Sequence, residues 1–167
     1  MKWLTREEMT RVLDAAKAAS ERDWLLLLIS YQHGLRVSET VALTAANIVD
    51  GHLLLQHLKG SKAIIHPLLE NEREPLQRLA SSTTGRLFLM CRRHALRLFK
   101  KYAALAGVPS FKTFHSLRHS CAVHGLKGGM TLPQVQKYLG HRSGASSLIY
   151  LEADESESAA AFAKALA

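Results

Sequence analysis

The sequence contains few cysteines and no long apolar run. Two of its 167 residues are cysteine, Cys91 and Cys121, which is too few for a disulfide framework and fits a cytosolic location. The longest apolar stretch, Trp24 to Ile29, is far shorter than the roughly 20 residues of a membrane span. The first residues lack the apolar run and the small-residue cleavage site of a secretory signal peptide. The sequence therefore argues against secreted, membrane-spanning and metal-cluster proteins.

Acidic residues are missing from a long part of the chain. The protein has 22 lysines and arginines against 14 aspartates and glutamates, a formal net charge of +8. Residues 86–142 contain no aspartate or glutamate, but they contain eleven lysines and arginines. A block of one charge sign favours a polyanionic partner, and nucleic acid is the partner it predicts. The alternative is a surface that is basic without a specific partner.

The hydrophobic pattern predicts one helix-rich domain. Hydrophobic residues make up 47% of the chain and charged residues 22%, which suits a buried core. Helical spacing predicts a capped helix after Thr5, a buried helix ending near Gly34, and helices over residues 38–43, 72–79, 92–106, 117–126, 132–139 and 159–166. Short strands are expected near residues 48, 52–56 and 63–67, around turns at Asp50–Gly51 and Gly60–Ser61. The expected fold is mainly α with a small antiparallel β-sheet (α+β), as a single domain over residues 1–167.

Two short motifs place basic side chains at the ends of predicted elements. In Gly34-Leu-Arg36-Val-Ser-Glu39, Arg36 follows the buried helix, and Glu39 is close enough in sequence to orient its guanidinium. Lys59 and Lys62 fall between two predicted strands, where a lysine can reach a groove or a phosphate. Taken alone, the first motif is better explained by a surface Arg–Glu pair and the second by a solvated turn lysine.

Two further motifs combine histidine with arginine or tyrosine. In His115-Ser-Leu-Arg118-His119, the spacing puts His115 and Arg118 on one helical face, where both can donate to one phosphate. Leu139-Gly140-His141 is followed by Tyr150, nine residues after His141. Core packing is the alternative for both motifs. A zinc site on His115 and His119 is the weaker alternative, because no carboxylate or thiolate completes a ligand set at the usual spacing.

The order of these four motifs closely resembles that of the tyrosine recombinase (phage integrase) family, over about Leu4 to Leu151. The resemblance implies that Tyr150 is the nucleophile and that Glu39 supports the site. The residues it implies as activating are Arg36, Lys59, His115, Arg118 and His141. It also implies a site-specific DNA recombinase or integrase that cleaves and rejoins DNA through a covalent 3′-phosphotyrosyl intermediate.

Physical chemistry supports the same roles. Free tyrosine has a pKa of about 10, so its phenol needs activation at neutral pH. Arg36 and Arg118 have the fork geometry that holds phosphate oxygens, His141 can donate a further hydrogen bond, and Lys59 suits protonation of the leaving 5′-oxygen. His115 suits a proton acceptor or a structural role. Because these cations supply the positive charge, we expect no metal and no cofactor.

Two alternative functions stay open at this point. Residues 131–143 could form part of a helix-turn-helix in a non-enzymatic DNA-binding regulator, although such a protein would not need Arg36, Lys59 and Tyr150 together. A standalone type IB topoisomerase would use the same covalent chemistry, but the compact motif set matches integrases better.

The resemblance also sets expectations for partners and for the ends of the chain. The expected partner is double-stranded DNA with paired core sites, on which the protein assembles as a tetramer; we expect a cytoplasmic, nucleoid-associated protein with no membrane partner. The pattern begins at Leu4, so the family's N-terminal DNA-binding domain is expected to be absent from this sequence, either because the chain is trimmed or because it belongs with naturally short members of the family. Residues 152–167 are expected to form a tail with a subunit-docking helix. Expected DNA contacts are Lys62, Arg92, Arg93, Arg97, Lys112, His119 and Arg142.

Overall fold

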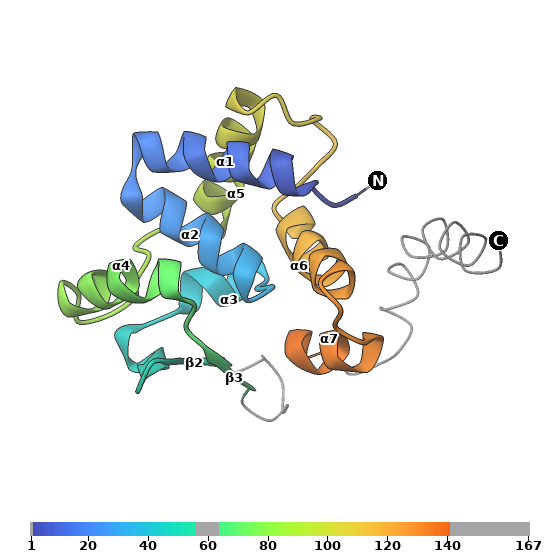
Figure 1. Ribbon diagram of the computed structural model, residues 1–167. Helices are drawn as coiled ribbons and strands as arrows, with labels where there is room; N and C mark the ends of the chain where they lie inside the picture. Colours follow the sequence, from blue (N-terminus) through green and yellow to red (C-terminus); the bar gives the residue numbers. More distant parts are fainter. Residues whose placement is uncertain (1, 56–63, 141–167) are drawn as a thin grey trace, which may run out of the picture.

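An apolar helix, α2 (Glu21–Gln32), runs through the middle of the molecule (Figure 1). The computed structural model describes residues 2–55 and 64–140. Every residue of α2 from Asp23 to Ser30 is buried, because α1, α3, α4 and α6 all pack against it. The short apolar run seen in the sequence is therefore the centre of the core, and none of the described helices is long and apolar enough to cross a membrane.

Two capped helices open the chain. α1 (Arg6–Ala19) begins at a capping box in which the Thr5 hydroxyl accepts from the N–H of Glu8 and the Glu8 carboxylate accepts from the N–H of Thr5. Met9, Val12 and Ala16 form its buried face. The serine at position 20 both ends α1 and caps α2, so the two helices form a tight antiparallel pair.

The small sheet follows a short helix, α3 (Val37–Ala42), and one turn of 3-10 helix, η1 (Ala45–Asn47). Strands β1 (Ile48–Val49), β2 (His52–Leu55) and β3 (Ile64–Pro67) are antiparallel in the order β1-β2-β3. The predicted Asp50–Gly51 turn is confirmed: both residues have positive φ, as a two-residue hairpin turn requires. The register pairs Leu53 with His66.

Four helices complete the described fold: α4 (Glu70–Ser81), α5 (Arg92–Leu105), α6 (His115–Lys127) and α7 (Leu132–Leu139). The predicted fold class and the predicted α7 are confirmed. α4 and α6 each begin two residues earlier than expected. Side chains of their first turns bind the backbone ahead of them: the Glu72 carboxylate accepts from the N–H of Leu69, the N-cap of α4, and the Ser116 hydroxyl accepts from the N–H of Thr113. The helix predicted over residues 159–166 and the Gly60–Ser61 turn lie outside the described residues.

Gly34 lets the end of α2 approach α7 closely. Its φ is +61°, a left-handed conformation that favours glycine. A Cβ atom at this position would overlap the Leu139 side chain and press on the Cys121 sulfur 3.3 Å away. The backbone just before Arg36 is therefore held against the C-terminal end of α7.

We expect Gly34→Ala to destabilise the protein by two effects, left-handed strain of about 1–2 kcal/mol and overpacking of about 1–3 kcal/mol. Gly107→Ala is the matched control, because Gly107 has a φ of +66° but no atom within 4 Å of an added Cβ. Urea unfolding of both variants isolates the packing effect. Equal losses in free energy of unfolding would contradict the close approach at Gly34.

Candidate active site

Two segments that are far apart in sequence bring four of the predicted site residues together. Arg36 and Glu39 lie at the start of α3, and His115 and Arg118 lie in the first turn of α6. Arg36 Nη1 donates to Glu39 Oε1 at 2.9 Å, and Arg118 Nη1 lies 4.0 Å from Glu39 Oε2. One carboxylate therefore lies between two guanidinium groups.

Arg118 is the largest fully buried side chain in the described residues, with an exposed fraction of 1%. Its Nη1 donates to the backbone carbonyl of Gly34, and its Nη2 donates to the carbonyl of Leu139 at 2.7 Å. Burying a guanidinium is costly unless it is paired and hydrogen-bonded, and the carbonyls and Glu39 meet that need. Arg118 thus joins the end of α2 to the end of α7.

Arg36 has the opposite environment. Its side chain is 47% exposed, whereas that of Glu39 is 8% exposed. Glu39 also accepts from the backbone N–H of Arg36 at 2.7 Å. The same carboxylate therefore caps the N-terminus of α3 and orients the Arg36 guanidinium. The predicted orienting role of Glu39 therefore has a structural basis, and the arginine it holds is open to a ligand from solvent.

The two histidines of α6 are in a positive environment. Partial burial, with the charges of Arg118 and Arg36, lowers the pKa of His115. The pKa of His119 is lowered to about 4, chiefly by burial and further by the neighbouring His115, Lys2 and Arg118. The rings of His115 and His119 meet edge to face with centroids 4.5 Å apart. Both imidazoles are therefore neutral at pH 7 and can accept a proton or a hydrogen bond.

Several predicted site residues fall outside the described residues. They are Lys59, Lys62, His141, Arg142 and Tyr150, together with the tail over residues 152–167. The chain nevertheless leads to them from described positions. β2 and β3 flank the segment that carries Lys59, and α7 ends at Gly140, directly before His141.

The expected DNA contacts differ in their exposure. Arg92, Arg93 and Arg97 are exposed on the first turns of α5, where a phosphate backbone can reach them. Lys112 is not: only 4% of it is exposed, and its ammonium forms an ion pair with the Glu8 carboxylate. This burial argues against the DNA-contact role predicted for Lys112, whose positive charge instead fixes α1 to the segment before α6.

The sequence did not predict the buried groups that bind Arg118 or that lie next to its segment. The acceptors at Gly34 and Leu139 are backbone carbonyls, which every residue has, so the residue types at these positions do not indicate this role. A buried network of His33, His66 and Glu72 was also missed, although a histidine directly after an apolar helix is a signal that could have found it. Within residues 2–55 and 64–140, no group of three or more His, Cys, Asp or Glu side chains could hold a metal ion.

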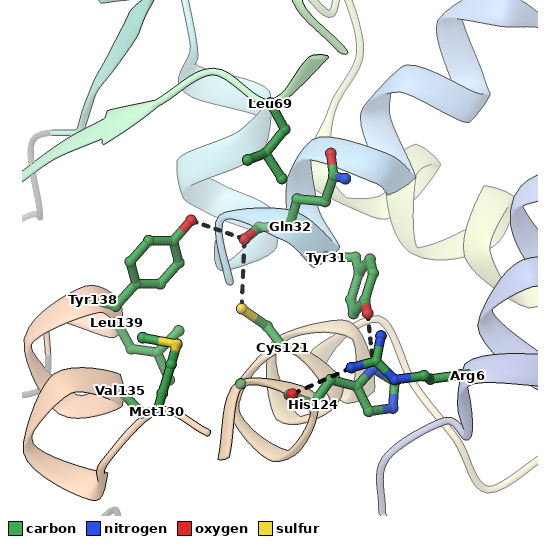
Figure 2. Close-up of a pocket in the computed structure, with 11 residues that line it drawn as sticks. Arg6, Tyr31, Gln32, Leu69, Cys121, His124, Met130, Val135, Tyr138 and Leu139 are labelled. Atoms are coloured by element: carbon green, nitrogen blue, oxygen red, sulfur yellow. Dashed lines mark hydrogen bonds between the residues drawn. The ribbon is translucent and has the colours of Figure 1, made fainter. Parts of the chain in front are cut away.

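A cavity of about 340 Å³ opens between α2, α6 and α7 (Figure 2). Its walls come from α2, α6 and α7 and include Tyr31, Cys121, Val135 and Leu139. The Tyr138 hydroxyl donates to the Gln32 carbonyl at 3.1 Å across it. Burial raises the pKa of the Cys121 thiol to about 12, so this thiol is unreactive at neutral pH.

Comparison with known proteins identifies related chains. The sequence model of the phage integrase family matches residues 2–157. The type 1 fimbriae regulatory protein FimE of Escherichia coli (strain K12) is 28% identical over 160 residues, which cover 85% of this chain and 81% of FimE. Tyrosine recombinase XerA of Pyrococcus furiosus is 33% identical over 164 residues, which cover 89% of this chain and 56% of XerA.

Solved structures share the fold. The crystal structure of XerA recombinase has a TM-score of 0.78 at 25% identity, over 89% of this chain and 57% of that chain. A pre-cleavage complex of the XerH site-specific recombinase with its difH substrate has a TM-score of 0.79 at 24% identity, over 90% of this chain and 50% of that chain. This chain spans a little over half the length of XerA and half of XerH.

The lowered pKa of His119 predicts a pH dependence of stability. An unfolded histidine titrates near pH 6.5, so between about pH 6.5 and 4 the unfolded chain binds more protons than the folded protein. The free energy of unfolding should therefore fall as the pH falls through this window. Urea unfolding at several pH values should show a shallower fall for His119→Gln. A slope unchanged from the parent would show that His119 does not titrate in this way.

Proposed function

The chain belongs to the phage integrase family, and we propose that it is a site-specific DNA recombinase that cleaves and rejoins DNA through a covalent 3′-phosphotyrosyl bond to Tyr150. The observation that carries the proposal is the cluster of Arg36, Glu39, His115 and Arg118, which come from distant segments and meet at one place. A helix-turn-helix regulator would have no use for two guanidinium groups held by one carboxylate.

In the proposed cleavage step, the Tyr150 oxygen attacks the scissile phosphorus, and the bond from phosphorus to the 5′-oxygen breaks. Arg36 and Arg118 donate to the non-bridging oxygens, on which negative charge accumulates in the transition state, and His141 adds a donor. Because hydrogen bonds hold Arg36 and Arg118 before the DNA arrives, these two groups need little reorganisation during the reaction. Arg118 in particular is already held by two carbonyls.

Two proton transfers complete the step. His115 is neutral at pH 7 because its pKa is lowered, so it can take the phenolic proton of Tyr150. Lys59 gives a proton to the departing 5′-oxygen. In the reverse reaction, the 5′-hydroxyl of the same or another strand attacks the phosphotyrosyl bond, which rejoins the DNA without loss of bond energy. No metal and no cofactor is needed for this sequence of steps.

The proposed substrate is double-stranded DNA with paired core sites, on which copies of the chain assemble as a tetramer. The exposed Arg92, Arg93 and Arg97 at the start of α5 support a phosphate interface on this helix. We assign Lys62, His119 and Arg142 to the same interface. Residues 152–167 would dock on a neighbouring copy, for which the apolar cavity between α6 and α7 offers an acceptor. Such a substrate implies a cytoplasmic, nucleoid-associated protein.

Tyr150→Phe should abolish the covalent adduct and leave DNA binding close to that of the parent, because only the nucleophilic oxygen is lost. A suicide duplex with a nick near the scissile phosphate traps the adduct, which is read as a band of lower mobility on a denaturing gel. Tyr138→Phe is the control: it removes a hydroxyl that bonds to Gln32 and should retain the adduct. An adduct from Tyr150→Phe at the parent's yield would remove Tyr150 from this role.

Lys59→Ala should slow cleavage of ordinary DNA and slow it far less when sulfur replaces the bridging 5′-oxygen, because a thiolate leaves without a proton. Arg36→Ala should lose roughly 10²–10³-fold in rate on both substrates, since it acts on the non-bridging oxygens. Single-turnover adduct formation gives both rates. The assignment of Lys59 as the acid fails if sulfur does not restore cleavage by Lys59→Ala.

A further inference from the structure

Residues 109–114, which lead into α6 and which we call the entry segment, are held by two lysine side chains. The Lys112 ammonium donates to the Glu8 carboxylate in the first turn of α1. From α5, Lys100 Nζ donates to the backbone carbonyl of Ser110 and, at 2.8 Å, to that of Lys112. In Figure 1 the first turn of α1 lies beside the start of α6. The entry segment is therefore bound to two different helices.

The ion pair of Lys112 with Glu8 is a buried, directional contact. Lysines are almost never fully buried unless they are paired, and only 4% of Lys112 is exposed. Partial burial alone would raise the pKa of Glu8, but hydrogen bonds from Lys112 and from the Thr5 N–H lower it, so this carboxylate is ionised at pH 7. A charge-assisted hydrogen bond is stronger than a neutral one. The pair therefore holds the entry segment to α1 at a defined distance.

The start of the chain also holds the side of α6 that faces away from the catalytic candidates. The N–H of Leu4 donates to Ser120 Oγ at 2.8 Å, and Leu4 itself is fully buried. Because an α-helix turns by about 100° per residue, Ser120 lies on the side of α6 away from His115 and Arg118. Leu4 therefore fixes the middle of α6, whereas Glu8 fixes the segment from which α6 begins.

The position of the entry segment determines the position of His115, which is the first residue of α6. Two hydrogen bonds connect the segment to the first turn: the N–H of Ser116 donates to the Thr113 carbonyl at 2.8 Å, and the N–H of Thr113 donates to the Ser116 hydroxyl at 3.0 Å. The His115 ring meets the His119 ring edge to face in the next turn. A shift of the entry segment would therefore move His115 relative to Arg118.

We infer that Lys112 is a positioning residue for DNA cleavage: its ion pair with the first turn of α1 fixes the entry segment and thereby places His115 relative to Arg118. The inference rests on the proposed function, since it concerns residues to which that function gives roles in cleavage. A merely structural role would lower the stability of the protein and leave the cleavage rate of each folded molecule unchanged. A positioning role predicts slower cleavage by a protein that is still folded and still binds DNA.

Three variants of the full chain test the inference, with one matched control. Lys112→Met removes the ammonium and keeps an unbranched side chain. Glu8→Gln removes the carboxylate charge but keeps an oxygen that can cap α1, as glutamine does in a capping box. The double variant leaves neither charge buried without its partner, so it provides the test if a single variant unfolds. Arg11→Met is the control, because Arg11 Nε donates to the Ala106 carbonyl at 3.0 Å and so joins α1 to the end of α5 instead of the entry segment.

At saturating DNA, we expect all three variants to form the covalent adduct about 10²-fold more slowly than the parent, as a misplacement of about 1 Å can cause. The double variant should be no slower than the single variants, because all three remove the same contact. The affinity for DNA and the rate of Arg11→Met should match the parent's. Weaker DNA binding with a parent-like rate at saturation would return Lys112 to a DNA-contact role and overturn the inference. Parent-like cleavage by the folded double variant would overturn it as well.

A measurement without DNA tests the placement of His115 independently of cleavage. The His115 ring lies against the His119 ring, so the NMR signals of its ring protons depend on the position of that neighbour. Lys112→Met should shift these His115 signals, and Arg11→Met should leave them unchanged. Parent-like His115 signals in Lys112→Met would overturn the inference. A parent that forms no adduct would instead contradict the proposed function, so failure of that function and failure of this inference give different results.

Discussion

The burial of one guanidinium organises this molecule. Arg118 is a catalytic candidate, and it is also a structural bridge, since its two terminal nitrogens donate to the carbonyls that end α2 and α7. Those carbonyls lie two residues before Arg36 and two residues before His141. A cation removed from water needs fixed acceptors, so the requirement that keeps Arg118 stable also sets the spacing of the segments around it. The absence of a side chain on Gly34 makes the same approach sterically possible.

The site contains more positive than negative charge. Glu39 is the acidic side chain that the structure shows between Arg36 and Arg118, and it is largely buried while Arg36 reaches solvent. The imidazoles next to these cations have lowered pKa values, which keeps them uncharged at neutral pH. These cations repel one another, and in the proposed function a DNA phosphate is the anion that offsets this repulsion. The excess of positive charge over the single Glu39 carboxylate is the feature on which the proposed phosphate binding depends.

The sequence predicted the local features well and the long-range ones poorly. The Thr5–Glu8 capping box, the Asp50–Gly51 turn and the limits of α7 follow from rules that act within a few residues, and all are present. The pairing of Arg36 with Glu39 also follows from spacing. By contrast, the burial of Lys112 depends on Glu8, which is 104 residues away, and the contact of His33 with His66 depends on how β3 packs against α2. Residue type alone does not reveal which distant groups will meet in the interior.

A contact between the start of the chain and α6 has a consequence for biosynthesis. The N–H of Leu4 donates to the hydroxyl of Ser120, and α2 is covered partly by α6. A ribosome adds about 5–20 residues per second, so the apolar surface of α2 waits roughly ten seconds for its covering helix to emerge. During that interval the exposed apolar surface favours aggregation of the nascent chain. Because Arg118 arrives with the same helix, a chain that ends before α6 would lack both the helix that covers α2 and the guanidinium that bonds to the Gly34 carbonyl.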